Sequence, residues 1–286
     1  MYTGKRLLTF LLVIAADLWQ ANAVQAQTVP QVLQQADSLL ARGDYFSAVK
    51  LYDRVLFFDD SAYAINSYEK IAECYFQNRQ YDKAANYFSL AGKAEDNDSL
   101  AQSIFEKKTI SLILGEQFLS AREELFEMPE AYLKSQKGIL LTAMTLYGNQ
   151  ETDAAFNEFS KLEVLKKKDK ELARLKKRLI RVEKKNPKTA RVLSIIIPGS
   201  GQLYAGDWRN GLNSLLLTGG LMTLGVHTIA TIGFIDGILM VGPWYQRYYT
   251  GGFKRAEASV NALKKKVRYE VLQEMLRLSK DEKISY

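Results

Sequence analysis

The sequence has little of what most enzymes use for catalysis. Its 286 residues include one cysteine, Cys74, and one histidine, His227. These two residues cannot supply the usual nucleophile–base sets or the His and Cys clusters that bind catalytic metals. The glycine-rich run near residue 200 lacks the Lys-Ser/Thr pair of a phosphate-binding loop. We therefore expect no catalytic activity, no cofactor and no metal site.

The single cysteine also excludes an internal disulfide. If the chain is exported, as its N-terminal pattern described below indicates, the lack of a disulfide favours a bacterial periplasm over a eukaryotic secretory lumen. Cys74 lies between Glu73 and Tyr75 in a helical pattern, which favours a buried small residue over a reactive thiol.

Formal charge is almost absent between Arg209 and Arg247, where Asp236 is the only charged residue. One membrane span needs about 20 apolar residues, so this run is long enough for two connected helices. The apolar stretches 215–226 and 229–241 predict a transmembrane helix hairpin with its turn near His227 and Thr228. We expect His227 to be a turn residue near the membrane interface, not a ligand. Residues 199–252 hold 12 of the 18 glycines, which permit close approach of membrane helices.

The first 26 residues have the pattern of a secretory signal peptide. Lys5 and Arg6 precede an apolar run over residues 7–16, and small-x-small sites end at Ala23 and Ala26. We expect cleavage near one of these alanines; the alternative is an uncleaved anchor. Both interpretations place the chain from residue 27 outside the cytoplasm.

Residues 27–160 contain four copies of one pattern. Alanines recur at spacings of 36, 37 and 34 residues, at Ala48, Ala84, Ala121 and Ala155. Three residues before each alanine stands an aromatic residue or a threonine, and four residues after it an aromatic residue or a leucine: Tyr45, Tyr81, Phe118 and Thr152, then Tyr52, Phe88, Leu125 and Phe159. Upstream, a small residue is followed three positions later by a large one: Ala36, Ala72, Thr109 and Ala143, then Leu39, Tyr75, Leu112 and Leu146. Gly43 and Gly148 are expected at turns between helices.

This pattern resembles the tetratricopeptide repeat (TPR), a pair of antiparallel helices of about 34 residues. The resemblance implies an all-α fold in which helix hairpins stack into an α-solenoid. Such arrays usually bind proteins, so the expected partner is a protein or peptide on the TPR surface. We expect most of the abundant Tyr and Phe residues to pack between helices and a few exposed ones to line a binding groove.

Residues 161–190 are expected to form a basic amphipathic connector helix. Residues 161–191 contain 14 Lys or Arg and 4 Asp or Glu, and Leu165, Leu172, Leu175 and Leu179 form a narrow apolar seam. Pro187 is expected to end the helix. Three interpretations compete: the helix caps the TPR array with a solvated basic face, its basic face meets anionic lipid, or its seam pairs with another helix, for example in a second copy.

The segment after the connector carries a motif: Pro198, Gly199, Gly201, Gln202, Tyr204, Gly206, Gly211 and, later, Asp236. It resembles small bacterial membrane modules related to the TM-two domain. The resemblance covers residues 191–250 and implies a helix hairpin with an intramembrane aspartate. Because an ionised Asp in a membrane is costly, we expect Asp236 to hydrogen-bond near Gln202, Tyr204 or Asn213; the alternative is a proton- or partner-sensing site. Residues 251–286 are expected to be a basic helical tail.

Aromatic residues flank the apolar run at Trp208, Trp244, Tyr245 and Tyr248, as in an interfacial belt. We favour two spans, which return the tail to the periplasmic side, over three, which leave it in the cytoplasm. The expected location is a bacterial cell membrane, the inner membrane of a Gram-negative envelope, with the repeat domain in the periplasm.

Together these features predict a membrane-tethered TPR adaptor that is not an enzyme and docks periplasmic or envelope proteins. Expected contacts also include membrane lipids and a homo-oligomer; nucleic acid is excluded because an exported segment would not meet it. The alternative is a small oligomeric channel or transporter-accessory protein whose activity resides in the hairpin at 191–250.

Overall fold

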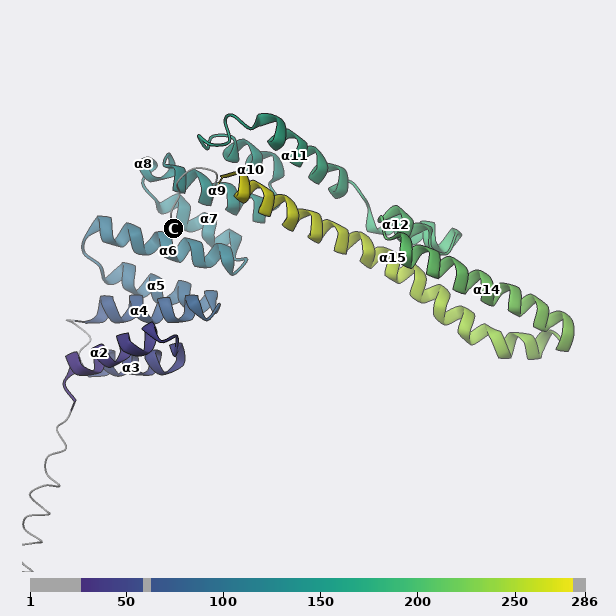
Figure 1. Cartoon of the computed structure of the whole chain (residues 1–286), viewed down its shortest axis with the longest axis horizontal. Helices are drawn as coiled ribbons and strands as arrows, with labels where there is room; N and C mark the ends of the chain where they lie inside the picture. The colour runs from purple at the N-terminus through teal and green to yellow at the C-terminus, as the bar shows by residue number, and fades with distance from the viewer. Residues whose placement is uncertain (1–26, 59–62, 280–286) are drawn as a thin grey trace, which may run out of the picture. The chain divides into compact units, whose positions relative to one another are not determined.

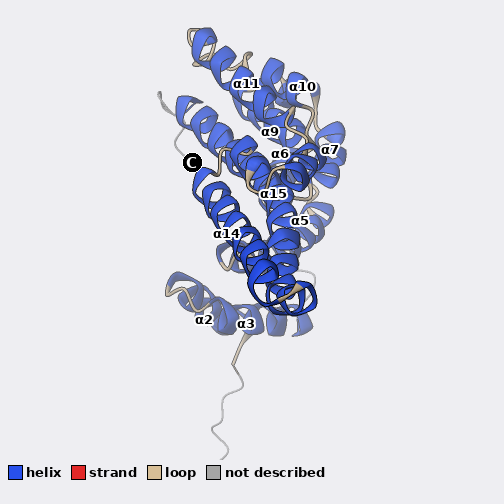
Figure 2. Ribbon diagram, turned by 90° about the vertical axis from the view of Figure 1, so that its right-hand side faces the viewer, coloured by secondary structure: helices blue, strands red, loops and turns tan. Residues whose placement is uncertain are grey.

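A computed structural model of the chain describes residues 27–58 and 63–279. Every regular element in those ranges is a helix (Figure 2). The fold is therefore all-α, as the sequence predicts. The predicted signal peptide lies outside the described residues and stays a prediction. The chain divides into two compact units, residues 1–150 and 151–286, whereas the sequence places the end of the repeat domain at residue 160.

Unit 1 is a solenoid of helix hairpins in which the helices pack on one another mainly in chain order (Figure 1). Three hairpins are followed by a short helix and a longer one. The helices are α2 (Val29–Ala41), α3 (Tyr45–Phe58), α4 (Ala64–Gln77), α5 (Tyr81–Ala94), α6 (Asp98–Leu114), α7 (Phe118–Glu127), α8 (Glu130–Leu133) and α9 (Gln136–Gly148).

The small residues of the repeat pattern lie where these helices cross. All of them have no exposed surface: Ala36, Ala48, Ala72, Ala84, Thr109, Ala121 and Ala143. Thr109 fits because its hydroxyl donates a hydrogen bond to the backbone oxygen of Phe105, 2.9 Å away. A larger side chain at these crossings would push the helix axes apart.

The turns between paired helices share one backbone conformation. The residue five positions before each repeat alanine is left-handed: Gly43 (φ 79°), Arg79 (φ 57°), Glu116 (φ 60°) and Gln150 (φ 67°). In the first turn the Asp44 amide donates to the Leu39 oxygen, and in the second the Gln80 amide donates to the Tyr75 oxygen. These bonds satisfy carbonyls at the helix end, as in a Schellman cap.

Gly148 lies two residues before the left-handed position of its turn, at Gln150. It is the last residue of α9, and a Cβ there would lie 2.2 Å from the Phe118 ring. The glycine is needed because the Phe118 ring packs directly on the backbone of α9.

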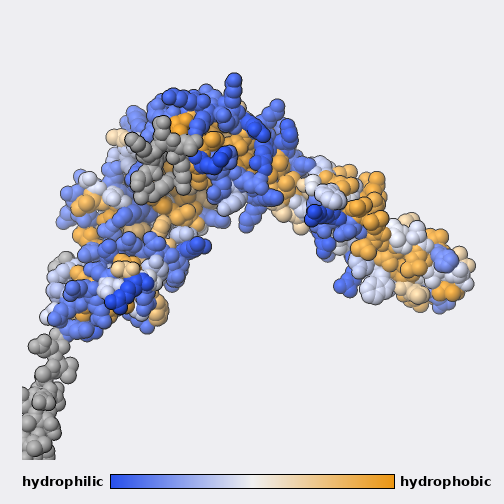
Figure 3. Space-filling view, viewed as in Figure 1, coloured by the Kyte–Doolittle hydropathy of each residue, from blue (hydrophilic) through white to orange (hydrophobic). Residues whose placement is uncertain are grey.

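Unit 2 consists of α10 (Thr152–Phe159), α11 (Asp169–Glu183), α12 (Pro187–Ile196), α13 (Ser200–Tyr204), α14 (Trp208–Ile232) and α15 (Phe234–Ser279). Helices α14 and α15 pack together as a hairpin. Within the described residues, α14 is the one helix long and apolar enough to cross a membrane. Figure 3 shows apolar side chains on the outside of this hairpin. Leu216, Leu224 and Leu239 are among its exposed apolar residues.

The turn of the hairpin lies at Gly233, not at His227 and Thr228 as predicted. Gly233 has φ 114°, a conformation that a residue without a side chain adopts readily. His227 lies inside α14, where its carbonyl accepts a hydrogen bond from the Thr231 hydroxyl at 2.9 Å. Thr228 bonds back to the Leu224 carbonyl in the same way. The threonines therefore remain in the helix, and the chain turns at the next glycine.

The basic connector is not one helix over residues 161–190. Helix α11 ends at Glu183, and Pro187 begins α12 instead of ending α11. Proline favours the first helical turn because its missing N–H has no partner there anyway. The Asn186 side chain caps α12 by accepting the Lys188 amide at 2.8 Å.

The leucine seam of α11 is buried, and α11 packs along α15 of the same chain. Ion pairs between Arg178 and Glu270 and between Arg268 and Glu183 join the two helices. Of the three interpretations of this segment, the structure supports pairing with another helix. The partner is the segment that the sequence predicts as a basic tail. This tail is not a separate element but the second part of α15, because that helix runs unbroken across residues 250 and 251.

Candidate functional site

The loop from Pro198 to Gly211, here called the signature loop, is the point where α12, α13 and α14 meet α15. Its glycines are required by close backbone contacts. A Cβ on Gly199 (φ 93°) would lie 2.1 Å from the Gly211 carbonyl oxygen, and one on Gly201 would lie 1.9 Å from the Ala190 oxygen. Any larger residue would force these helices apart.

Gln202 is fully buried in this junction, and its amide is satisfied on both sides. Its Oε1 accepts a hydrogen bond from the Ser194 hydroxyl at 3.0 Å, and its Nε2 donates to the Gly252 oxygen at 2.8 Å. The Ser194 Oγ also accepts the Gly201 amide at 2.9 Å. Because a buried amide without partners is costly, this network specifies how α12, α13 and α15 fit together.

Tyr204 links the signature loop to the end of α11. Its ring lies under the Lys185 ammonium, 4.4 Å from the nitrogen, and its carbonyl oxygen accepts a hydrogen bond from the same group. The Tyr204 hydroxyl accepts the Asn186 amide at 3.2 Å. The position of the α11–α12 turn therefore depends on Tyr204.

Asp207, which the sequence analysis did not single out, is the N-cap of α14. Its carboxylate accepts the Asn210 amide at 3.4 Å and the Ser259 hydroxyl at 3.2 Å. Gly206, with φ 85°, turns the chain just before it. An Asp directly before an apolar helix is a recognised N-cap signal, so this residue was predictable. No local pattern marks Gly252, because its partner Gln202 is distant in sequence.

Asp236 is far from the signature loop, so the predicted hydrogen bond to Gln202, Tyr204 or Asn213 is wrong. Helix α14 separates them: it has 25 residues, which corresponds to about 37 Å. Asp236 is exposed in the first turn of α15, beside the turn at Gly233. A carboxylate at a helix N-terminus is favoured by the helix dipole.

Unit 1 offers a second candidate surface. Its exposed large apolar side chains lie mainly on the second helix of each hairpin. They form what we call the second-helix face: Phe46, Phe57 and Phe58 on α3, Leu90 on α5, and Leu119 and Phe126 on α7. Phe46 and Phe126 are 71% and 73% exposed, respectively. Exposed aromatic residues of this kind are enriched in protein–protein interfaces.

Basic side chains lie over three rings of this face. The Lys50 ammonium lies 4.2 Å from the Phe46 ring, Arg54 lies 5.9 Å from Phe58, and Arg122 lies 5.7 Å from Phe126. Each pair is four residues apart on one helix, so each ring has a cation on the same face. The face therefore combines apolar contact area with positive charge.

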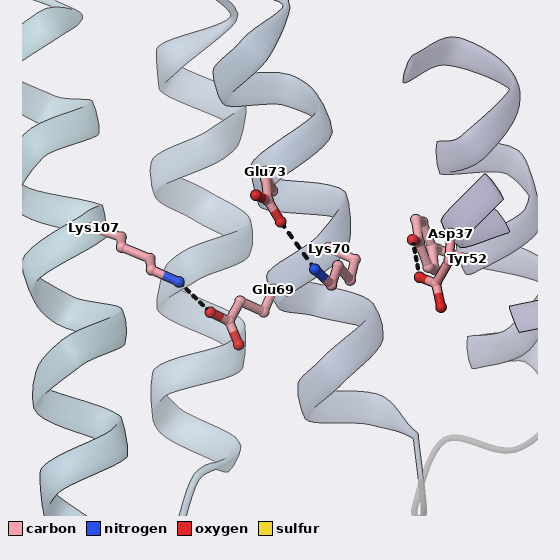
Figure 4. A network of polar contacts seen from close by, with 6 residues as sticks. All are labelled: Asp37, Tyr52, Glu69, Lys70, Glu73 and Lys107. Atoms are coloured by element: carbon pink, nitrogen blue, oxygen red, sulfur yellow. Dashed lines mark hydrogen bonds and ion pairs between the residues drawn. The ribbon is translucent and has the colours of Figure 1, made fainter. Parts of the chain in front are cut away.

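Polar contacts fix helices α2 to α6 of the solenoid (Figure 4). Lys107 of α6 pairs with Glu69 of α4, and Lys70 pairs with Glu73 within α4 at 3.2 Å. The Tyr52 hydroxyl donates to Asp37 at 2.6 Å, and burial together with this carboxylate raises the pKa of Tyr52. These contacts fix the helices and leave the aromatic face of the second helices unmasked.

Within residues 27–58 and 63–279, no three His, Cys, Asp or Glu side chains lie close enough together to hold a metal ion. Burial raises the pKa of the Cys74 thiol to about 11, so it is protonated at neutral pH. No protein-family model matches the chain, and no curated protein matches its sequence.

Proposed function

We propose that this protein is a membrane-tethered adaptor of the bacterial envelope, with no enzymatic activity, whose TPR-like solenoid docks other envelope proteins. The observation that carries the proposal is the presence, in one chain, of a helix-hairpin solenoid and a helix suited to crossing a membrane. Stacked hairpins present an extended surface, which is what such arrays use for binding proteins.

The second-helix face is the proposed docking surface. Phe46, Phe126 and Leu119 project from the solenoid without packing partners in the core. Burying a phenylalanine against a partner contributes roughly 1.5–3 kcal/mol. The adjacent cations favour a partner with acidic groups around an apolar centre.

The tether is proposed to be the α14–α15 hairpin in the inner membrane of a Gram-negative cell. The apolar start of α15, residues 234–246, spans about 20 Å at 1.5 Å per residue, less than the roughly 30 Å of hydrocarbon. The aromatic residues Trp244 and Tyr245 lie at the end of this stretch, and Tyr248 follows it. The proposal retains the signal peptide, which places the solenoid in the periplasm.

Site-specific photo-crosslinking in cells tests the docking surface. A photoreactive residue is placed at Leu119 in the full-length chain, and a matched one at Leu100, which is exposed on α6 outside the face. We expect defined envelope proteins to crosslink from position 119 and to be lost when Phe126→Asp is added. Identical products from both positions, or products indifferent to Phe126→Asp, would overturn the proposed surface.

Protease added to spheroplasts tests the topology separately. A C-terminal tag and an antibody to unit 1 report the two ends of the chain. Loss of the unit 1 epitope from intact spheroplasts is expected. Its protection, together with cleavage in lysed cells, would contradict the periplasmic location and redirect the search to cytoplasmic partners.

A further inference from the structure

A cavity of about 380 Å³ lies between α14 and α15, next to the signature loop. The residues that line it come from one face of each helix. On α14 they are spaced by about four residues, as Asn210, Ser214 and Thr218; on α15 the corresponding residues are Arg247, Gly251 and Arg255. This repeated spacing makes the cavity a groove between two antiparallel helices.

Two glycines of α15 shape this groove. A Cβ on Gly251 would meet no atom within 4 Å, so the space above it is empty. On Gly252 a Cβ would lie 2.8 Å from the Ser214 Oγ, which shows that the helices touch there. The cavity is therefore bounded on one side and open above Gly251.

Four of the polar groups around the groove lack partners. Thr218 is only 2% exposed, yet its Oγ1 has no hydrogen-bond partner, and the Ser214 Oγ is also unsatisfied. In the described part of the chain, neither Arg247 nor Arg255 makes an ion pair. No Asp or Glu lines the cavity. Buried hydroxyls are normally hydrogen-bonded, so the groove is suited to a ligand that accepts hydrogen bonds.

The chemistry of these groups favours a phosphate. Two guanidinium groups, two hydroxyls and the amide of Asn213 are all able to donate hydrogen bonds, and a phosphate has several oxygens that accept them. The cavity is also larger than one phosphate, which leaves space for the group attached to it.

The depth of the groove favours a lipid as the source of this phosphate. Thr218 and Asn210 are 14 and 22 residues from the end of α14 at Ile232, or about 21 Å and about 33 Å along the helix. The hydrocarbon core is about 30 Å thick. With the Gly233 turn at one face of the membrane, the Asn210 end of the groove lies at the headgroup level of the other face and the Thr218 end lies within the hydrocarbon.

We propose that the groove between α14 and α15 is a binding site for the phosphate of an anionic phospholipid, held by Arg247 and Arg255. Basic pockets between membrane helices bind such headgroups in general. The inference rests on the membrane insertion assumed in the proposed function, but it does not depend on the adaptor role.

Native mass spectrometry of the full-length chain in detergent tests the site, with phosphatidylglycerol and phosphatidylcholine as probes. Phosphatidylglycerol is expected to bind in preference, and Arg247→Gln with Arg255→Gln to weaken it on the order of tenfold or more. The control is Lys254→Gln with Lys265→Gln, which removes the same charge from exposed positions of α15 outside the cavity. Equal loss in both double variants would overturn the proposal, because general electrostatics would then explain the binding.

A second pair of variants keeps every charge. Gly251→Leu fills the open groove, whereas Gly219→Leu adds the same side chain to an open position of α14 outside the cavity. Only the former is expected to reduce phosphatidylglycerol binding. Equal binding in the two variants would contradict a site in the groove.

Inorganic phosphate distinguishes the two sources of the ligand. If inorganic phosphate in large excess displaces the lipid completely, a free anion is the ligand and the lipid assignment is wrong. If the chain stays in the membrane but binds lipid independently of Arg247 and Arg255, this inference fails and the tether stands. If the chain is not retained in the membrane, the proposed function fails first.

Discussion

At the residue scale, the close backbone contacts of the signature loop leave no space for added atoms. Gly199 and Gly201 stand where a Cβ would overlap a carbonyl oxygen of a neighbouring helix. Gln202 fills the same junction with a fully satisfied amide. The motif therefore maintains the junction of four helices, and the residues available for ligands lie beside it on α14 and α15.

Gly201→Ala tests this interpretation. The new methyl group would lie 1.9 Å from the Ala190 oxygen, which is backbone and cannot rotate away. We expect the free energy of unfolding to fall by about 1–3 kcal/mol, measured by thermal unfolding of the full-length chain in detergent. Gly219→Ala is the control, because its Cβ meets no atom within 4 Å. Equal stability of the two variants would show that the junction is looser than described.

Cys74 provides a prediction that depends on pH. Its side chain is buried, and burial raises its pKa from the usual 8.5 or so to about 11. As pH rises from about 8.5 to 11, the unfolded thiol ionises before the folded one, so the unfolded state binds fewer protons and stability falls by up to about 1.4 kcal/mol per pH unit.

Two measurements check this. A thiol reagent at neutral pH is expected to label Cys74 slowly in the folded chain and rapidly after denaturation. Denaturant titrations at pH 8 and pH 10 are expected to differ less for Cys74→Ala than for the natural chain. Rapid labelling of the folded chain would mean that the thiol is accessible.

At the element scale, the hairpin is defined by its register. The turn at Gly233 places Gly252 beside Ser214 and Gly237 beside Ile229. A turn at His227 and Thr228 would instead bring Ser214 opposite Val241 and move the arginines of α15 away from Thr218. The groove therefore exists only in the register with its turn at Gly233.

Disulfide trapping distinguishes the two registers. In a Cys74→Ala background, Ser214→Cys with Gly252→Cys is expected to oxidise nearly completely, because their side chains would be in contact. Ser214→Cys with Val241→Cys is expected to stay reduced. Non-reducing gel shifts after protease cleavage between the helices report the result, and the opposite outcome would restore the turn near His227.

At the scale of the whole molecule, unit 2 joins an apolar hairpin to a long charged helix. Helix α15 is 46 residues long and begins in the apolar hairpin, while its second half pairs with α11. Its buried residues Val267, Val271 and Met275 form a stripe that complements the leucine seam of α11. One helix thus continues from the proposed membrane segment into the water-exposed part of unit 2.

Membrane retention tests this division. Leu216 and Leu224 are exposed on α14, where the proposal has them facing lipid. Replacing each by lysine costs roughly 2.5–3.5 kcal/mol if it lies at the bilayer centre, so we expect the double variant to leave the membrane fraction on alkaline extraction. Lysines at Ala258 and Ala262, exposed on the later part of α15, are the control and should not alter retention. If both variants are retained equally, α14 does not span the membrane.

The sequence by itself determined the all-α class and the positions of the hairpin crossings. Ala48, Ala84 and Ala121 recur at a repeat period, and small residues recur where helices must approach closely. It also located the apolar α14 region, because hydrophobic length is a local property of the chain.

The break between α11 and α12 and the turn of the hairpin have local signals, Pro187 and Gly233. Tertiary structure alone decided how the turn after α11 is held and which helix covers the leucine seam. Each depends on residues distant in sequence: Lys185 on Tyr204, and Arg268 on Glu183. The groove has the same origin, since Thr218 and Arg247 carry no local pattern that marks them as neighbours. Local patterns specify which face of a helix is apolar, whereas packing decides which helix covers it.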